Sequence, residues 1–368
     1  MLASIYRPFR LGALFALRAG GIFNRMRDSN WRHQRLLILC YHGVSLEEEH
    51  LWRPALYVNP QLFESRLETL ARGGYSVLPL KDAIQCLYQR DLPPRSVVLT
   101  FDDGTSDFYQ TALPKLKQYG FPATVYQTTY YCDHDRPIFH LVCSYILWKR
   151  RGEVLNVGKR FGLPALMDLR TEGSRQAILD QLVANSKAQN FSEHEKNQVA
   201  KELAEALAID YSGLVKKRVL QLMRSHEIAE LASHGIDFQL HTHRHRTPFD
   251  AALFSREIRD NRRSLEAMIP NESFTHFCYP SGVYRQEFVP WLIAQGVVSA
   301  TTCDPGLASP DSNPLLLPRF IDSSYCTQLE FEAWLTGAAS LIPRRRTHAS
   351  VQSARNPEPA RSYASMQK

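Results

Sequence analysis

Two adjacent carboxylates, Asp102 and Asp103, end a short apolar segment and are followed by Gly104. Neighbouring residues of a strand point to opposite faces, but a turn at Gly104 could direct both carboxylates into one cavity. Two ionised carboxylates side by side repel each other unless they share a proton or a cation. The pair therefore suits a division in which one aspartate binds a metal ion and the other acts as a base. An Asx turn that closes the strand is the alternative for the same residues.

Three alternate histidines, His241, His243 and His245, directly follow another apolar segment. Histidine is a common metal ligand. In an extended chain His241 and His245 would lie ~13 Å apart, too far for two metal–nitrogen bonds of ~2.1 Å, so this pair requires a turn. His241 and His243, about 6.6 Å apart on one strand face, could share a metal ion without a turn. The spacing leaves both pairs open, and a solvated basic loop is the alternative without a metal.

A third segment, residues 277–282, joins an apolar strand to Pro280 and Gly282. Such a turn can expose backbone N–H groups to a ligand, and we expect Tyr279, Pro280 and Ser281 to contact the substrate. An ordinary turn between a strand and a helix explains the same residues equally well.

The elements that must position these residues alternate between strands and helices. Apolar and β-branched segments predict strands at 36–41, 75–78, 96–101, 123–126, 236–240 and 297–301, with a further strand leading into Phe277. Apolar residues at helical spacing predict helices at 59–72, 80–90, 111–119, 251–268 and 285–295. Asn59 before Pro60 is expected to cap the first of these helices. This alternation predicts a parallel α/β sheet or barrel.

The remaining segments break this alternation. Residues from about 140 to 232 predict a helical insertion, and residues 343–368, rich in Arg, Ser, Pro and Ala, predict a disordered basic tail. Residues 1–35 form a basic arm in which the apolar stretch 11–17 is too short to span a membrane. This arm could lie on a membrane surface as a basic amphipathic helix, or it could be disordered.

Composition narrows the class of protein. The chain has 368 residues, 44% of them hydrophobic, so a sizeable core is feasible. The net charge of +7 comes from the two ends, and no zinc-finger or RNP-like pattern indicates nucleic acid as a partner. Seven cysteines without a C-x-x-C pair argue against a disulfide framework. The arm also has no small-residue cleavage site after its apolar stretch, so a cytoplasmic or inner-membrane location is favoured over secretion.

The order of these motifs resembles the polysaccharide deacetylase family with its NodB-homology domain. Residues 100–104 look like the family motif T-F-D-D-G, 241–245 look like H-[ST]-x-x-H, and 277–282 resemble a softer motif around a proline. Residues 41–44 and 317–319 also resemble members of the family. The resemblance covers about 36–335, interrupted by the helical insertion.

The resemblance implies a fold, a metal site and a reaction. The fold is an α/β, distorted (β/α)7 barrel. Asp103, His241 and His245 would hold a divalent metal ion, with zinc favoured, and Asp102 would be the catalytic base. The metal would polarise an acetyl carbonyl and acidify a water molecule, so the implied activity is removal of N-acetyl groups from an amino-sugar polysaccharide or glycolipid.

The sequence departs from the family pattern in two places. The family usually has an arginine where this chain has Cys278, and a late L-x-H motif that supplies a general acid is missing. Arg319 could orient Asp102 in place of that arginine. The missing acid leaves two alternatives open: a non-catalytic carbohydrate-binding protein on the same scaffold, and a deacylase of a small amide. In each carbohydrate reading the partner is an N-acetylated glycan, and the basic arm remains a candidate for peripheral membrane contact.

Overall fold

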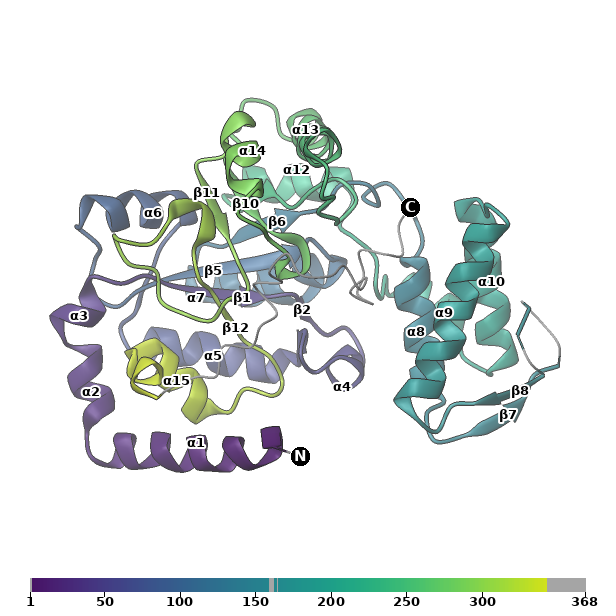
Figure 1. Ribbon diagram of the computed structural model, residues 1–368, viewed down its shortest axis with the longest axis horizontal. Coiled ribbons are helices and arrows are strands. Elements are labelled where there is room, and N and C mark those ends of the chain that lie inside the picture. Colours follow the sequence, from purple (N-terminus) through teal and green to yellow (C-terminus); the bar gives the residue numbers. More distant parts are fainter. Residues whose placement is uncertain (1, 159–161, 164, 343–368) are drawn as a thin grey trace.

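Parallel strands form the centre of the fold (Figure 1). The computed structural model describes residues 2–158, 162, 163 and 165–342. Within these residues one sheet has eight strands, in the order β11-β10-β9-β6-β5-β1-β12 with β4 paired to β5. The strands are β1 (Leu37–Tyr41), β4 (Ser76–Val77), β5 (Ser96–Asp103), β6 (Thr124–Gln127), β9 (Asp237–Leu240), β10 (His276–Cys278), β11 (Ser299–Thr301) and β12 (Phe320–Ile321).

The sheet curls so that its two edges approach each other. Every pairing between its strands is parallel. Leu317, shortly before β12, bridges to Thr301 of β11, so the chain links one edge of the sheet to the other. The predicted α/β fold with a distorted barrel is confirmed.

Helices cover the outside of the curled sheet. They are α5 (Pro60–Arg72), α7 (Leu113–Tyr119), α12 (Ser225–Ser233), α13 (Ala251–Met268), α14 (Phe288–Ala294) and α15 (Gln328–Thr336), with a π-helical turn at Phe108–Ala112 before α7. Another helix, α6 (Leu80–Gln89), packs against the cluster that contains Ile38 of β1. Local capping explains where several of them begin. Asn59 accepts a hydrogen bond from the Leu62 amide at 2.7 Å, as expected for the cap of α5.

The strands divide their side chains between two cores. From β1, Leu37 and Leu39 belong to the large core between sheet and helices. Ile38 belongs to a smaller cluster together with Val98 of β5 and Tyr126 of β6, on the inner face of the curled sheet. Because strand residues alternate between faces, residues at even positions of β1 and β5 point inward. This alternation determines which polar side chains of β1 and β5 lie close together.

The helical insertion forms a lobe beside the barrel (Figure 1). It contains α8 (Phe139–Lys149), α9 (Glu172–Ala188), α10 (Glu193–Ala206) and α11 (Tyr211–Lys216), and its apolar residues build a core of their own. It also contains an antiparallel hairpin, β7 (Val154–Asn156) and β8 (Leu166–Asp168), which the sequence did not predict. The predicted insertion extended to 232, but Ile228 and Leu231 of α12 pack in the barrel core.

The N-terminal segment is folded onto the barrel. It forms α1 (Leu2–Ala19), α2 (Ile22–Arg27) and α3 (Asn30–His33). Leu14 and Phe23 are buried in the main core, and Arg18 pairs with Glu332 of α15 at 3.2 Å. A disordered arm is therefore wrong for this segment. The predicted disordered tail, 343–368, lies outside the described residues.

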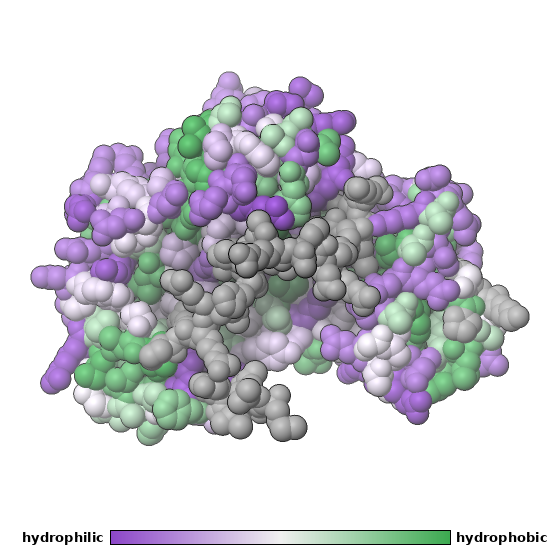
Figure 2. Space-filling model, in the orientation of Figure 1, coloured by the Kyte–Doolittle hydropathy of each residue, from purple (hydrophilic) through white to green (hydrophobic). Residues whose placement is uncertain are grey.

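One side of α1 faces away from the barrel. Phe9 and Phe15 are 75% and 67% exposed, and Figure 2 shows hydrophobic residues gathered over the α1 and α15 side of the molecule. None of the helices in the described ranges combines the length and apolarity needed to cross a bilayer. Peripheral membrane contact through this segment stays a prediction, as does the location of the protein.

Candidate metal and catalytic centre

Asp103, His241 and His245 meet at the carboxyl ends of β5 and β9. The Nε2 atoms of His241 and His245 lie 3.2 and 3.0 Å from the same Asp103 oxygen, Oδ1. One potential ligand atom from each residue lies within 4.8 Å of the other two. The sequence predicted that these three residues would come together although 138 positions separate Asp103 from His241, and the structure places them so.

Two local turns make this meeting possible. Asp103 and Gly104 have φ angles of 71° and 77°, which break the strand alternation so that Asp102 and Asp103 both reach the cavity side. A Cβ atom at position 104 would lie 1.9 Å from the Gln127 side chain, so glycine is required there. After His241 the chain turns at Thr242, whose φ is 61°.

The turn at Thr242 also decides which two of the three histidines lie close together. The Thr242 hydroxyl accepts the Arg246 amide at 3.0 Å and closes the loop, which brings the ring centroids of His241 and His245 to 5.0 Å. His243 points elsewhere, with its Nδ1 2.8 Å from the Thr129 hydroxyl. The geometry therefore favours His245 over His243 as the partner of His241.

The donor set suits a divalent metal ion. The Nδ1 of His241 lies 2.9 Å from the Cys278 carbonyl oxygen, which can only accept, so Nδ1 carries the proton. In a neutral imidazole the Nε2 lone pair then faces the Asp103 oxygen, and two acceptors in contact require a cation between them. One carboxylate and two imidazoles are ligands that zinc takes in catalytic sites. These residues fit a metal ion, whose identity they do not fix.

Asp103 and His245 reinforce each other's charge. Burial opposes ionisation of Asp103, but His245 and His241 outweigh it and hold the pKa of Asp103 well below its usual range. Burial likewise disfavours the imidazolium of His245, yet Asp103 raises the pKa of His245. The carboxylate is thus ionised at neutral pH, as a metal ligand must be.

Asp102 lies beside this cluster, held by Arg319. The two outer guanidinium nitrogens of Arg319 donate to the two Asp102 oxygens at 2.7 Å each. Arg319 also donates to the Thr302 carbonyl and the Thr100 hydroxyl. Burial opposes ionisation of Asp102, but Arg319 holds the pKa of Asp102 below its usual range. Asp102 is therefore an ionised, oriented carboxylate, the form that a base needs.

His42 is a neighbour of Asp102 to which the sequence had assigned no role. It follows β1 directly, and its Nε2 lies 3.8 Å from Asp102 Oδ2. Burial lowers the pKa of His42, and Asp102 opposes that shift. The signal was available in part: the segment 41–44 resembled the family, and β1 pairs with β5 so that Tyr41 lies opposite Phe101. The strand order, which the sequence did not reveal, puts His42 next to Asp102.

A cavity of about 320 Å³ opens onto these groups. His42, Asp103 and His245 line its polar side. Its other walls are largely apolar. They come from the loop before β3 (Tyr57–Val58), from the start of α8, from the segment before α12 and from β12, and they include Leu56, Ile138, Leu141, Leu222 and Ile321. The site is thus a pocket with charged groups at one side and aliphatic walls at the other.

The predicted substrate-binding turn is only partly at this cavity. Ser281, with φ of 56°, lines the cavity. Tyr279 is 0% exposed, and its hydroxyl donates to the Leu315 carbonyl at 3.0 Å, while Pro280 is also buried. The ring of Tyr279 packs edge-on against Phe277 inside the core. Tyr279 is therefore corrected from a substrate contact to a core residue, because its hydroxyl and ring are both satisfied there.

Known proteins share parts of this sequence. The sequence profile of the polysaccharide deacetylase family matches residues 89–155. YxkH of Bacillus subtilis, which carries a provisional polysaccharide deacetylase name, is 39% identical over 93 residues, 25% of this chain and 31% of that protein. The poly-β-1,6-N-acetyl-D-glucosamine N-deacetylase of Staphylococcus epidermidis is 30% identical over 175 residues, 46% of this chain and 59% of that enzyme. The chain thus spans less than two thirds of the length of either relative.

A solved structure shares the fold. The deacetylase PplD of Streptococcus pyogenes, in complex with acetate, superposes with a TM-score of 0.54 at 20% sequence identity, covering 82% of this chain and 98% of that one. At this identity the likeness concerns the fold alone. Residues 89–155 thus match the polysaccharide deacetylase family, and the names of the relatives agree with that match.

Proposed function

We propose that this protein is a metal-dependent hydrolase that removes N-acetyl groups from an amino-sugar polysaccharide or glycolipid. The observation that carries the proposal is the meeting of Asp103, His241 and His245 beside the Asp102–Arg319 pair, at one cavity. The deacetylase names of its relatives support the same chemistry. Zinc is the ion we propose.

The three ligands would hold the ion on the cavity side of the site. When bound, the ion would supply positive charge that polarises the acetyl carbonyl and acidifies a water molecule. Asp102 would then take the proton of the attacking water as the new C–O bond forms. Arg319 keeps this carboxylate ionised and fixed in orientation before the reaction.

The leaving amine needs a proton when the C–N bond breaks. The proton that Asp102 removes from water is the one that balances this step, and His42, 3.8 Å from Asp102, is placed to return it. His140 also lines the cavity, but burial lowers the pKa of His140 to about 3 and no carboxylate opposes that shift. We therefore assign the proton transfer to His42 and not to His140.

Acetate release tests this function. Metal-loaded protein is incubated with N-acetylglucosamine oligomers of several linkages, and acetate is measured alongside the metal content of the protein. Asp102→Asn should keep its metal and lose about 100-fold or more in rate. A fully active Asp102→Asn variant would overturn the base assignment, and metal-loaded protein that releases no acetate from any oligomer would overturn the function.

A second candidate, a deacylase of another amide, is favoured by one observation. Aliphatic side chains such as Leu56 and Leu141 form much of the cavity wall, which suits an acyl chain longer than acetyl. A series of N-acyl glucosamine oligomers from acetyl to hexanoyl separates the candidates. If each added methylene is buried, kcat/KM should rise by about fourfold per methylene; a fall beyond acetyl supports the first candidate.

A further inference from the structure

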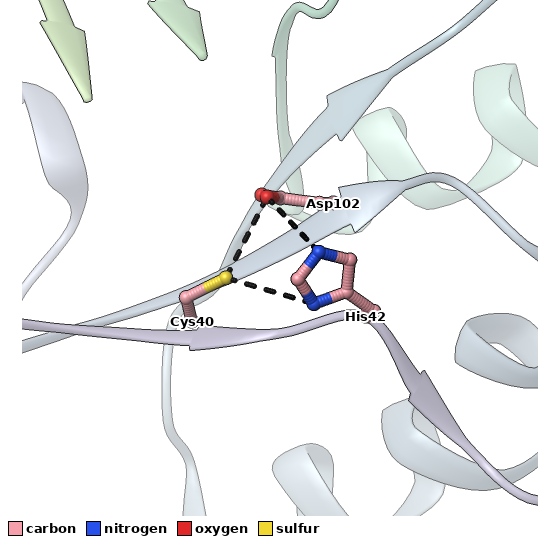
Figure 3. A group of neighbouring side chains, drawn as sticks. All are labelled: Cys40, His42 and Asp102. Carbon is pink, nitrogen blue, oxygen red and sulfur yellow. Dashed lines mark hydrogen bonds and ion pairs between the residues drawn. The ribbon is translucent and has the colours of Figure 1, made fainter. Parts of the chain in front are cut away.

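The Cys40 thiol and the His42 imidazole lie close to the Asp102 carboxylate, on its side that faces β1 (Figure 3). Cys40 Sγ lies 3.5 Å from Asp102 Oδ2 and 4.0 Å from His42 Nδ1. His42 Nε2 lies 3.8 Å from the same Asp102 oxygen. One ligand atom from each of the three residues lies within 4.8 Å of the other two. None of the three belongs to the Asp103–His241–His245 set.

The fold imposes this convergence. β1 and β5 are parallel neighbours in which Cys40 lies opposite Thr100. Cys40 and Asp102 both occupy even positions, so they point to the inner face of the curled sheet. His42 comes directly after β1, and its ring lies beside the Cys40 thiol and the Asp102 carboxylate (Figure 3).

The three atoms have the chemistry and spacing of a zinc site. Sulfur, imidazole nitrogen and carboxylate oxygen are all zinc ligands, and bonds of 2.0–2.3 Å place the ligands of a tetrahedral ion roughly 3.4–3.8 Å apart. The separation of 3.5 Å between Cys40 Sγ and Asp102 Oδ2 lies in that range, and one nitrogen of His42 lies within 4.8 Å of both ligand atoms. In the present arrangement Nδ1 of His42 faces Cys40 and Nε2 faces Asp102, so the His42 ring must shift for one of its nitrogens to bind the same ion as the other two groups.

Charge decides what kind of ion the site would accept. Arg319 already contacts Asp102 at 2.7 Å, and this guanidinium repels a second cation. A thiophilic ion overcomes this repulsion by displacing the Cys40 proton, since the thiolate adds a negative charge and the best ligand. One proton leaves for each ion bound. An ion without affinity for sulfur, such as Mg²⁺, gains nothing comparable.

The ion has a route to the site. Cys40 and Asp102 are 0% and 2% exposed, but the His42 side chain is 15% exposed and lines the cavity. An ion in the cavity therefore meets His42 first and reaches the other two ligands behind it.

We propose that Cys40, His42 and Asp102 form a second, inhibitory binding site for Zn²⁺ and similar thiophilic divalent ions. An ion bound there occupies both the base and the histidine that returns the proton. The inhibition rests on the function proposed above, whereas binding of the ion does not.

Cobalt tests the binding directly. Full-length protein is titrated with Co²⁺: the first equivalent fills the oxygen and nitrogen ligands of the Asp103 set, and a second should produce thiolate-to-cobalt charge-transfer absorption in the near ultraviolet. Cys40→Ala should abolish this band. Cys278→Ala is the matched control, because the Cys278 thiol contacts the same Asp102 oxygen at 3.4 Å but lies outside the trio. Absence of the band in the wild type, or its loss in Cys278→Ala alone, overturns the site.

Inhibition is tested separately on the loaded enzyme. Excess Zn²⁺ should inhibit wild type and Cys278→Ala, while Cys40→Ala should need at least about tenfold more zinc for half inhibition. Cys40→Ser, which is close in size to the buried thiol, guards against a folding defect, and the cobalt spectrum of the first site checks that each variant is folded. A cobalt band that depends on Cys40, together with equal zinc inhibition in all variants, would retain the site and overturn its inhibitory role.

Discussion

The Arg319 guanidinium lies against the Asp102 carboxylate in a two-point contact, with both N–O distances 2.7 Å and the two side chains 0% and 3% exposed. Such a pair fixes the carboxylate in orientation as well as in charge. Arg319 thus contacts Asp102 in place of the arginine that the family pattern has at position 278. The base can thus be held from the last part of the barrel rather than from β10.

Replacing Arg319 by lysine should separate orientation from charge. Lysine keeps the positive charge but offers a single nitrogen, so Asp102 loses one of its two contacts. We expect kcat to fall by about 100-fold with little change in KM. Arg66→Lys is the control, because Arg66 forms an equally buried pair with Asp322 at 2.9 Å. If both variants lose activity in proportion to their loss of stability, measured by urea unfolding, the orienting role of Arg319 is refuted.

Replacing His42 by glutamine should slow the chemical step and leave metal binding unchanged. His42 lies outside the Asp103 set, so metal content should stay unchanged, while the rate of acetate release should fall by about 100-fold or more. His140→Gln is the matched control in the same cavity and should stay within a few-fold of wild type. Equal effects of the two variants would remove His42 from its assigned role.

A stability measurement can decide whether His243 or His245 is a metal ligand. An ion that binds only the folded protein stabilises it, by about 2.7 kcal/mol when free metal is 100 times its Kd. A chelator should therefore lower the melting temperature of wild type and of His243→Gln, whose native ring contacts Thr129 instead. In a Cys40→Ala background, which removes the proposed second site, His245→Gln should melt at one temperature with or without chelator. Persistent stabilisation of His245→Gln by metal would contradict the ligand set.

Much of the fold could be predicted from the sequence because its signals are local. The helix expected at 251–268 is α13, capped by the Asp250 side chain, and the strands follow their apolar segments. The Asp103–His241–His245 cluster depended on the resemblance, since the residues alone left His243 open. His42 was missed because its place depends on which strands are neighbours. β1 and β5 are not consecutive strands, and no local pattern reveals that they pair.

Other differences arise from packing over long distances. The sequence left open whether residues 1–35 form a helix or a disordered arm, because α1 gains its stability from distant contacts, through Leu14 in the core and through α15. Tyr279 was expected to contact the substrate because it lies at the turn around Pro280. The Leu315 carbonyl, far along the chain, accepts its hydroxyl and draws the side chain into the core.

Asp107 should make stability depend on pH. Its Oδ2 accepts the Val44 amide at 2.5 Å, just after His42. Burial, with a contribution from Glu49, raises the pKa of Asp107 to about 7 from 3.8. The folded protein therefore binds a proton that the unfolded chain has already lost between about pH 4 and pH 7. The favourable contribution is complete below pH 4 and disappears as pH rises through about 7.

Asp107→Asn isolates this contribution. The amide oxygen can still accept the Val44 amide, but it does not titrate. From pH 4.5 to 8, the unfolding free energy of wild type should decline relative to the variant, by on the order of 2–4 kcal/mol. Urea unfolding at several pH values measures the difference. Parallel pH profiles for the two proteins would show that Asp107 has an ordinary pKa.

The N-terminal segment should contribute strongly to stability through Arg32. This side chain is 0% exposed and donates to the carbonyls of Leu335, Arg35 and Ser96 at 2.8, 2.7 and 3.1 Å. Arg32→Met would leave these acceptors buried without their donors, at about 1–3 kcal/mol each. We expect a total loss of at least about 3 kcal/mol. Arg25→Met, at an exposed position of α2, should change stability by no more than about 0.5 kcal/mol. If the two variants unfold at the same urea concentration, the segment does not join α15 to β5 in solution.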